Sequence, residues 1–204
     1  MIHPAVLVFA SYLIGSIPAA YLAGKLTHGI DLREHGSGNL GATNVYRVLG
    51  ARTAIIVLLA DVLKGAIPVL LFPGITDAAR PDLWAVAYAL AAIAGHVRSV
   101  FLLWRGGGKG VATAAGAFMS LAPLPSLVAL AIFVIVLFAW GYVSLGSLSA
   151  ATVLPIVIAL REGVHSPLFA VSAVVAAFVF WTHRGNIGRL RRGEEPRFGK
   201  KSPT

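Results

Sequence analysis

Long apolar runs separated by short polar segments constrain this chain more than any other feature of its sequence. Several runs approach the roughly 20 apolar residues that a helix needs to cross a bilayer. Hydrophobic residues make up 57% of the 204 positions and charged residues 12%, whereas a soluble domain has about 25% charged residues. A soluble bundle would also need polar faces on its helices, and these segments have almost none. The sequence therefore predicts an all-α fold, a polytopic helical bundle in a membrane.

Seven membrane spans are expected, with polar segments or prolines at their ends. They are residues 4–24, 53–72, 83–103, 111–121, 125–141, 148–160 and 167–182. The first span lacks a basic leader and is expected to be retained. The fourth and sixth are short, so we expect them to tilt, to thin the bilayer or to stop partway. The chain is interpreted as one integral-membrane domain over residues 1–204, with a polar and basic tail over residues 184–204.

Lysine and arginine outside the spans lie mostly in residues 25–52, in residues 105–109 and in the tail. The opposite side carries Arg80 and Arg161, each near acidic residues. Because cytoplasmic loops are enriched in Lys and Arg, we expect the N-terminus outside the cell and the C-terminus in the cytoplasm. Topology thus explains the net charge of +9, and nucleic acid is not an expected partner. Three polar segments would then share the cytoplasmic side and form one site: residues 34–50, residues 105–110 and residues 183–197.

The segment "WRGGGKGVATAAG", residues 104–116, combines glycines with Lys109 directly before an apolar helix. Gly107, Gly108 and Gly110 let the backbone approach a ligand closely, and a helix N-terminus favours an anion. The segment differs from a P-loop, in which Ser or Thr follows the lysine. A flexible loop or close helix packing is the alternative explanation for the glycines, but Lys109 favours a phosphate cradle.

The segment "EHGSGNLGATNVYRVLG", residues 34–50, gathers small, polar and charged residues within an otherwise apolar sequence. The guanidinium of Arg47 is a planar fork suited to phosphate oxygens. An alternative is that Ser37 or Asn39 only caps a helix that runs toward Gly50. Capping explains one residue, but it does not explain the whole group of candidate binding residues: Ser37, Gly38, Asn39, Thr43, Asn44 and Arg47.

The segment "THRGNIGRLRRGEEPRFG", residues 182–199, follows the last span. His183 and Asn186 are three residues apart, so a helical continuation of the span would put them on one face. Histidine exchanges protons near neutral pH, and an asparagine can orient a hydroxyl or a carbonyl group. The alternatives are that the neighbouring arginines only anchor the span against anionic lipid and that His183 is an ordinary interface histidine.

Ionisable residues also occur inside the expected spans. Asp61 and Lys64 are three residues apart and are expected to neutralise each other, because a charge inside a membrane costs about 2.5–3.5 kcal/mol. His96 and Arg98, near the end of the third span, are expected to face the same polar interior. A transporter for a phosphorylated solute is the alternative function, since it would need polar or broken elements near the midplane. Polar clusters gathered on one side favour an enzyme.

In chain order, "GSGNLGATNVYR", "GGGKGVATAAG" and "HRGNIGRLRRGEEP" resemble the three signature motifs of the bacterial acyl-phosphate-dependent glycerol-3-phosphate acyltransferases, the PlsY family. The resemblance covers nearly the whole chain and implies a multi-pass enzyme of the bacterial cytoplasmic (inner) membrane whose active site faces the cytoplasm. The implied reaction moves a fatty acyl group from acyl phosphate to glycerol 3-phosphate, giving lysophosphatidate and inorganic phosphate in phospholipid biosynthesis. The implied enzyme uses no cofactor and no metal, and a soluble enzyme that supplies acyl phosphate is an expected partner.

The resemblance also implies roles for individual residues. The catalytic set is Ser37, Lys109, His183 and Asn186. The substrate- and phosphate-binding set is Gly38, Asn39, Thr43, Asn44, Arg47, Gly107, Gly108, Gly110 and Glu195, which is favoured over Glu194 by the proline that follows it. We expect the glycerol hydroxyl to attack the acyl carbonyl directly, helped by positioning and charge stabilisation. Either His183 or a substrate phosphate accepts the proton.

Overall fold

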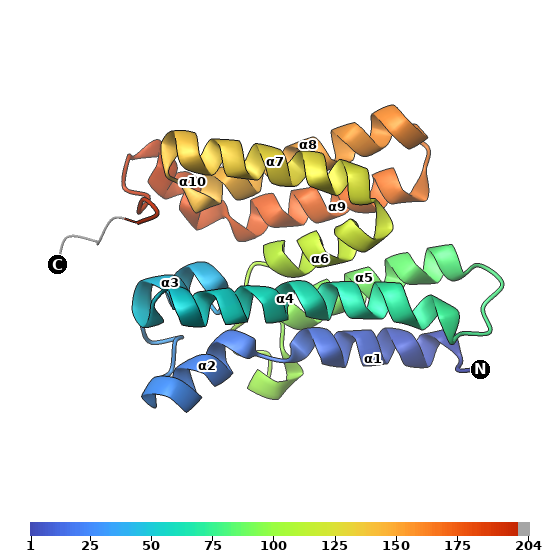
Figure 1. Cartoon of the computed structure of the whole chain (residues 1–204), viewed down its shortest axis with the longest axis horizontal. Coiled ribbons are helices and arrows are strands. Elements are labelled where there is room, and N and C mark those ends of the chain that lie inside the picture. Colours follow the sequence, from blue (N-terminus) through green and yellow to red (C-terminus); the bar gives the residue numbers. More distant parts are fainter. Residues whose placement is uncertain (200–204) are drawn as a thin grey trace. The chain divides into compact units, whose positions relative to one another are not determined.

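The computed structural model describes residues 1–199, and the end of the expected tail, residues 200–204, lies outside the described residues. The chain divides into two compact units at Leu121, although its sequence was interpreted as one domain. The first unit contains α1 (Pro4–Ser16), α2 (Ala19–His28), α3 (Ala42–Leu49), α4 (Ala51–Leu71), α5 (Pro81–Val97) and α6 (Val111–Leu121), with the short turns η1 (Phe72–Gly74) and η2 (Val100–Leu102). The second unit contains α7 (Pro123–Trp140), α8 (Val143–Glu162), α9 (Pro167–Thr182) and α10 (Arg184–Arg191) (Figure 1). Residues 1–199 form no β-strand, so the all-α prediction is confirmed for them.

The number of helices that are long enough to cross a bilayer differs from the expected seven. Within residues 1–199 there are five such segments: Pro4–His28, Ala51–Gly74, Pro81–Leu102, Pro123–Trp140 and Val143–Glu162. The pair α9 and α10, bent by 59°, makes a sixth if it counts as one span. Helix α6, the expected fourth span, has 11 residues and is about 16 Å long, roughly half of the hydrocarbon thickness. Helix α6 is thus as short as the fourth span was expected to be, and it would complete a crossing only where the bilayer is thinned.

The first span is broken at Ile17 and Pro18, where one continuous helix was expected. Proline has no N–H group and its ring clashes with the preceding turn, which favours a break at Pro18, although α4 and α8 continue through Pro68 and Pro155. The carbonyl groups freed by the break are satisfied from other elements. The Ser99 hydroxyl donates to the Ser16 carbonyl (2.5 Å), and the Lys64 ammonium donates to the Ile17 carbonyl (3.1 Å). Broken helices persist in membranes only with such partners.

Glycines let the helices of the first unit approach each other closely. Gly65 of α4 lies against the Thr113 backbone of α6, and Gly116 of α6 lies against the Val62 backbone of α4. A side chain on either glycine would collide with the facing backbone. Such contacts are typical of membrane helices, which gain their packing energy from close approach. They fix α6 firmly on α4.

In the second unit, α8 packs beside both α7 and α9 (Figure 1). The turn between α7 and α8 is short because Gly141 adopts a left-handed φ of 79°. The segment after α10 packs on this turn, where the Phe198 N–H group donates to the Gly141 carbonyl (2.7 Å) and the Arg197 guanidinium lies over the Tyr142 ring. These contacts hold the C-terminal end of the third polar segment next to the start of α8.

Candidate active site

The first and second polar segments are joined inside the first unit. We name residues 105–110 the glycine loop. The Leu40 N–H group donates a hydrogen bond to the Gly107 carbonyl (3.3 Å), and the Arg33 guanidinium donates to the Arg105 carbonyl (3.0 Å). The structure therefore brings together two of the three segments that were expected to share a site.

Arg33, which the sequence analysis did not single out, is held by Asp31. Its Nε and Nη2 atoms donate to the Asp31 carboxylate at 3.0 and 2.6 Å, and its guanidinium lies 5.2 Å from the centre of the Tyr21 ring. The hydrogen bonds from Arg33 lower the pKa of the Asp31 carboxyl group to about 2, so the pair is ionised at neutral pH. An Asp-x-Arg pair directly before the polar segment is the signal that could have revealed this link.

Asn44 shapes the loop that leads into α3. Its side chain is buried, its Oδ1 atom accepts from the Ser37 N–H group (2.8 Å), and its Nδ2 atom donates to the His35 carbonyl (3.0 Å). Gly36 and Gly38 have φ angles of 62° and 69°, in the region that favours glycine. A side chain on Gly36 would also collide with the Asn44 amide. Asn44, expected to bind substrate, thus holds the loop that presents the exposed Ser37.

Helix α3 carries Thr43 and Arg47 one turn apart and therefore on the same face. Arg47 is exposed and Thr43 is half-buried. The N-cap of α3 is Gly41, a residue without a side chain, in place of Ser37 or Asn39. The alternative interpretation, in which Ser37 or the half-buried Asn39 caps this helix, is therefore wrong.

The glycine loop packs against the C-terminal end of α5. The Gly108 N–H group donates to the His96 carbonyl (3.2 Å). A side chain on Gly108 would meet the His96 ring, and a side chain on Gly107 would meet the Val97 carbonyl. Close packing, one of the two alternatives to a phosphate cradle, thus accounts for these two glycines, although it does not account for a lysine beside them.

Lys109 lies between this packed part of the loop and α6. It is half-buried, and the following Gly110 has a φ of 83° that turns the chain into the helix at Val111. The positive end of the helix dipole and the charge of Lys109 therefore belong to the same short stretch of chain. Both favour an anion at this end of α6.

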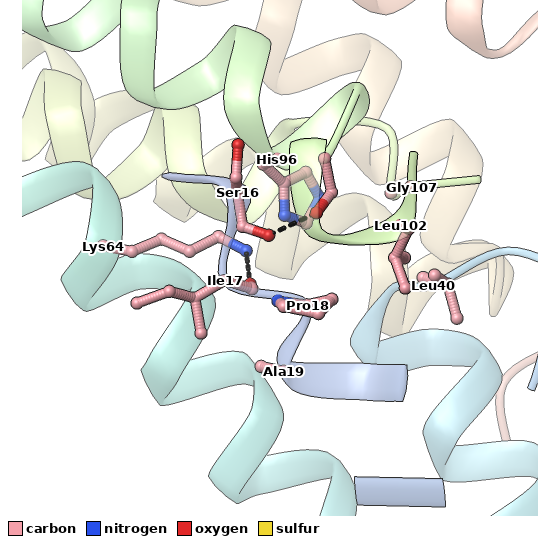
Figure 2. A pocket seen from close by; sticks show the side chains of 11 residues that line it. Ser16, Ile17, Pro18, Ala19, Leu40, Lys64, His96, Leu102 and Gly107 are labelled. Atoms are coloured by element: carbon pink, nitrogen blue, oxygen red, sulfur yellow. Dashed lines mark hydrogen bonds between the residues drawn. The ribbon is translucent and has the colours of Figure 1, made fainter. Parts of the chain in front are cut away.

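A small pocket lies beside the glycine loop, with about 210 Å³ of empty volume (Figure 2). It is lined by Gly107 and Gly108, by Leu40, and by Lys64 and His96 from α4 and α5. The break between α1 and α2 closes another side. This lining includes an ammonium group and an imidazole, so it suits a small polar group better than a fatty acyl chain.

Asp61 and Lys64 form a buried ion pair in α4, as predicted, with 2.7 Å between Oδ1 and Nζ. His96 of α5 adds a third ionisable group, whose Nδ1 atom lies 3.5 Å from the same carboxylate oxygen. The exposed fractions of the three residues are 2%, 6% and 6%. Arg98 is exposed instead, and its guanidinium donates to the Trp104 carbonyl (3.3 Å). The expectation that His96 and Arg98 face one interior is wrong for Arg98.

The third polar segment belongs to the second unit and begins at the bend between α9 and α10. His183 lies at this bend and is buried, with its Nδ1 atom 2.8 Å from the Val179 carbonyl. Because a carbonyl only accepts hydrogen bonds, Nδ1 carries the hydrogen, and Nε2 is the proton acceptor of the neutral ring. Asn186, three residues later in α10, is also buried. A helix does follow the last span, but it is bent by 59° from α9 at His183, so the predicted continuation is interrupted there.

Glu195 is a buried acceptor for three donors of the second unit. Its carboxylate accepts hydrogen bonds from Ser144 Oγ (2.7 Å), Asn186 Nδ2 (2.6 Å) and Arg189 Nε (2.8 Å). Burial raises the pKa of this carboxyl group, but the hydrogen bonds outweigh burial and hold the pKa below its ordinary value. Glu195 is therefore an anion at neutral pH, which suits a residue that orients the Asn186 amide better than one that contacts phosphate.

The chain matches a known family along almost its whole length. The family described as "Glycerol-3-phosphate acyltransferase" matches residues 5–193. Proteins named glycerol-3-phosphate acyltransferase from Geotalea daltonii and Trichlorobacter lovleyi are each 50% identical to this chain. The matches cover 93% and 92% of this chain and 95% and 94% of those proteins. The chain belongs to the glycerol-3-phosphate acyltransferase family.

Solved structures of PlsY (YgiH), described as an integral membrane glycerol 3-phosphate acyltransferase, share the fold. The glycerol 3-phosphate form matches with a TM-score of 0.87 and 35% identity over 96% of each chain. The lysophosphatidic acid form matches with a TM-score of 0.83 and 34% identity over 96% of this chain and 95% of that one. The predicted PlsY-family membership and membrane bundle are thereby confirmed. Membership of an acyltransferase family also decides against the transporter alternative.

Proposed function

We propose that the chain transfers a fatty acyl group from acyl phosphate to a hydroxyl group of glycerol 3-phosphate. The products would be lysophosphatidate and inorganic phosphate, in the first acylation step of phospholipid biosynthesis. The supporting observation is the junction of two anion-favouring elements, the loop and helix that carry Arg47 and the glycine loop that carries Lys109, through the Leu40–Gly107 hydrogen bond. Both substrates and one product contain phosphate, so two linked anion-binding elements suit this reaction.

The chemistry requires no covalent nucleophile, because acyl phosphate is a mixed anhydride with a good leaving group. The glycerol hydroxyl oxygen attacks the acyl carbonyl carbon. The bond from that carbon to the phosphate oxygen then breaks, and phosphate leaves with the bonding electrons. Positioning and charge stabilisation provide most of the acceleration. In support, the chain has no cysteine, and a backbone carbonyl, that of Val179, orients the Nδ1 atom of His183.

The proton of the attacking hydroxyl goes to Nε2 of His183 in this proposal. The Nδ1 atom of His183 already donates to the Val179 carbonyl, which leaves Nε2 as the basic nitrogen. Ser37 and the carbonyl oxygen of Asn186 orient the reacting groups. Glu195 is a positioning residue that acts through Asn186, in place of the direct phosphate contact expected from the sequence. A substrate phosphate is the alternative proton acceptor.

The phosphate groups are held by cations, amides and hydroxyls of the first unit. Lys109 binds one phosphate group, together with the N–H groups of the glycine loop and of the first turn of α6. Arg47 and Thr43, on one face of α3, bind another phosphate group. Gly38 and Asn39 in the preceding loop contribute to this contact. Asn44 positions that loop through its hydrogen bonds to the backbone.

The reaction takes place at the cytoplasmic face of a bacterial cytoplasmic membrane. The concentration of Lys and Arg on one side of the expected topology supports this location. The fatty chain would lie among apolar helices while its phosphate lies in the polar segments. A soluble enzyme that forms acyl phosphate would deliver it to this face.

A donor assay with the purified full-length protein tests the proposal. Acyl phosphate, acyl-CoA and acyl carrier protein thioesters of one chain length are each supplied with glycerol 3-phosphate. Lysophosphatidate and inorganic phosphate are both quantified. We expect equal amounts of the two products from acyl phosphate and no lysophosphatidate from the thioesters. Lysophosphatidate formed from a thioester, with none from acyl phosphate, contradicts the proposed donor.

A further inference from the structure

The glycine loop rests on one buried ring. The nearest atoms that a methyl group on Gly108 would meet all belong to the His96 imidazole, with Cε1 at 2.5 Å and Cδ2 at 3.0 Å. The backbone of the two residues is also joined, because the Gly108 N–H group donates to the His96 carbonyl (3.2 Å). The position of the loop therefore depends on where the His96 ring lies.

Charged groups of α4 fix this ring. The Nδ1 atom of His96 lies 3.5 Å from Asp61 Oδ1, and the same oxygen accepts from Lys64 Nζ at 2.7 Å. Lys64 in turn donates to the Ile17 carbonyl at the break between α1 and α2, as Figure 2 shows. A continuous series of polar contacts thus runs from the broken first span through α4 to the ring beneath the glycine loop.

Burying three ionisable side chains in an apolar bundle is costly, and such groups in membrane proteins usually have a function. Asp61 and Lys64 neutralise each other without a histidine, so their pairing does not explain His96. The geometry does explain it. With the Nδ1–H group directed at the carboxylate, the plane of the ring is set, and its Nε2 edge faces Gly108.

We propose that Asp61, Lys64 and His96 form a positioning network that sets the glycine loop, and through it Lys109, for phosphate binding. The inference rests on one part of the proposed function, namely that the glycine loop binds phosphate. The three residues act through the loop and not by contact with the reacting atoms. Loss of the network is expected to weaken anion binding even in variants whose fold is intact.

A double-mutant cycle in the full-length protein separates this role from a purely structural one. Gly108→Ala places a methyl group against the ring at a position without left-handed backbone. His96→Asn removes the outer half of the ring but keeps an N–H donor on the side of Asp61. Binding of inorganic phosphate and of glycerol 3-phosphate is measured from the rise in unfolding temperature with ligand concentration. The unfolding temperature without ligand is recorded for every variant.

Each single substitution is expected to weaken phosphate binding by about 10- to 100-fold, the range that corresponds to one misplaced charge-assisted hydrogen bond. In the double variant the methyl group fills space that the ring has left. The phosphate affinity of the double variant is therefore expected to be about tenfold higher than it would be if the two single losses simply multiplied. Gly107→Ala is the matched control, because its methyl group would meet the Val97 carbonyl, which His96→Asn leaves in place. In the Gly107→Ala/His96→Asn double variant, the loss of phosphate affinity is expected to equal the product of the two single losses.

Three results overturn the inference. The first is normal phosphate affinity in a folded His96→Asn variant. The second is a loss of affinity in the Gly108→Ala/His96→Asn double variant that equals the product of the two single losses. The third is coupling that changes the unfolding temperature without ligand but leaves phosphate affinity uncoupled. If His96→Asn does not fold, Asp61→Asn keeps the volume of the carboxylate, and normal phosphate binding by that variant equally overturns the inference. Failure of acyl phosphate as the donor contradicts the proposed reaction but leaves these binding measurements valid.

Discussion

Two buried side chains of the second unit use hydrogen bonds in opposite ways. Glu195 accepts from three donors and stays ionised, whereas His183 donates through Nδ1 and keeps Nε2 as its basic atom. The first arrangement fixes a neighbour, and the second prepares a nitrogen to take a proton. Substitution of each residue should therefore change different kinetic quantities.

His183→Asn is expected to reduce kcat by about 100-fold or more, the usual contribution of a general base, with little change in KM. In the natural enzyme, activity should fall on acidification as Nε2 becomes protonated, and the variant should lack this part of the pH dependence. Steady-state kinetics between about pH 5 and 9 measures both effects. Near-normal turnover by the folded variant would instead assign the proton to a substrate phosphate.

Glu195→Gln is expected to reduce kcat by about 10- to 100-fold, because the Asn186 amide loses its charged acceptor and reorients. The KM for glycerol 3-phosphate should change little if Glu195 acts through Asn186. Glu194→Gln is the matched control, since Glu194 is exposed and forms an ion pair with the exposed Arg192. A large rise in KM with unchanged kcat would restore Glu195 to the substrate-binding set.

The pH dependence of Glu195 provides a separate check. Its folded pKa lies below that of the unfolded chain, so its contribution to stability is complete above a pH of about 4.3 and is lost as the pH falls through the folded pKa. Between about pH 5 and 7, Glu195 should therefore contribute the same stability at every pH. If activity falls reversibly in this range, the unfolding temperature should not fall with it because of Glu195. Parallel measurement of the two quantities tests this expectation.

Lys109→Ala is expected to lower kcat/KM by about 100- to 1,000-fold, comparable to the loss of one donor that stabilises transition-state charge. Lys25→Ala, at an exposed position of α2, is the control for a simple loss of positive charge. Retention of most activity by the folded Lys109 variant would contradict the phosphate-cradle assignment.

At the scale of elements, apolar runs separated by polar segments and prolines predicted the ends of most of the long helices within a few residues. The expected span 53–72 is α4, Ala51–Leu71, and the expected span 167–182 is α9, Pro167–Thr182. The break at Pro18 was missed because hydropathy continues through it. Its stabilising partners, Ser99 and Lys64, are distant in sequence, and hydropathy carries no information about such hydrogen bonds.

The break itself makes a stability prediction. Lys64→Met leaves the buried Asp61 carboxylate without its cation and the Ile17 carbonyl without its donor, so we expect a loss of about 3–5 kcal/mol. The double variant Asp61→Leu/Lys64→Met removes both charges and should be less destabilised than the single one. Unfolding in detergent compares the two, and equal losses would show that the charge imbalance contributes little.

At the scale of the molecule, the motifs identified polar segments but did not reveal how these segments are held. The Leu40–Gly107 hydrogen bond joins segments far apart in sequence, and Asn44 and Glu195 turned out to bind protein groups. A sequence motif identifies a polar residue without telling whether its partner is a substrate or a neighbouring backbone group. Only the folded arrangement distinguishes the two.

The sidedness of the chain can be measured directly, because it contains no natural cysteine. A cysteine at Thr27 is expected to react with a membrane-impermeant thiol reagent only from the cytoplasmic side. Cysteines at Asp77 and Val164 are expected to react only from outside. Labelling of whole cells and of inverted vesicles distinguishes these outcomes, and Thr27 and Val164 reacting from the same side would contradict the predicted topology.

The interlocked glycines of α4 and α6 imply that remote mutations can disable the enzyme. A single methyl group at Gly116 must push α6 away from Val62, and Lys109 lies only two residues before this helix begins. Displacement deep in the bilayer would thus be transmitted to the charged end of α6. Inherited loss of activity need not map to residues near the substrate, and revertants should appear on the facing helix.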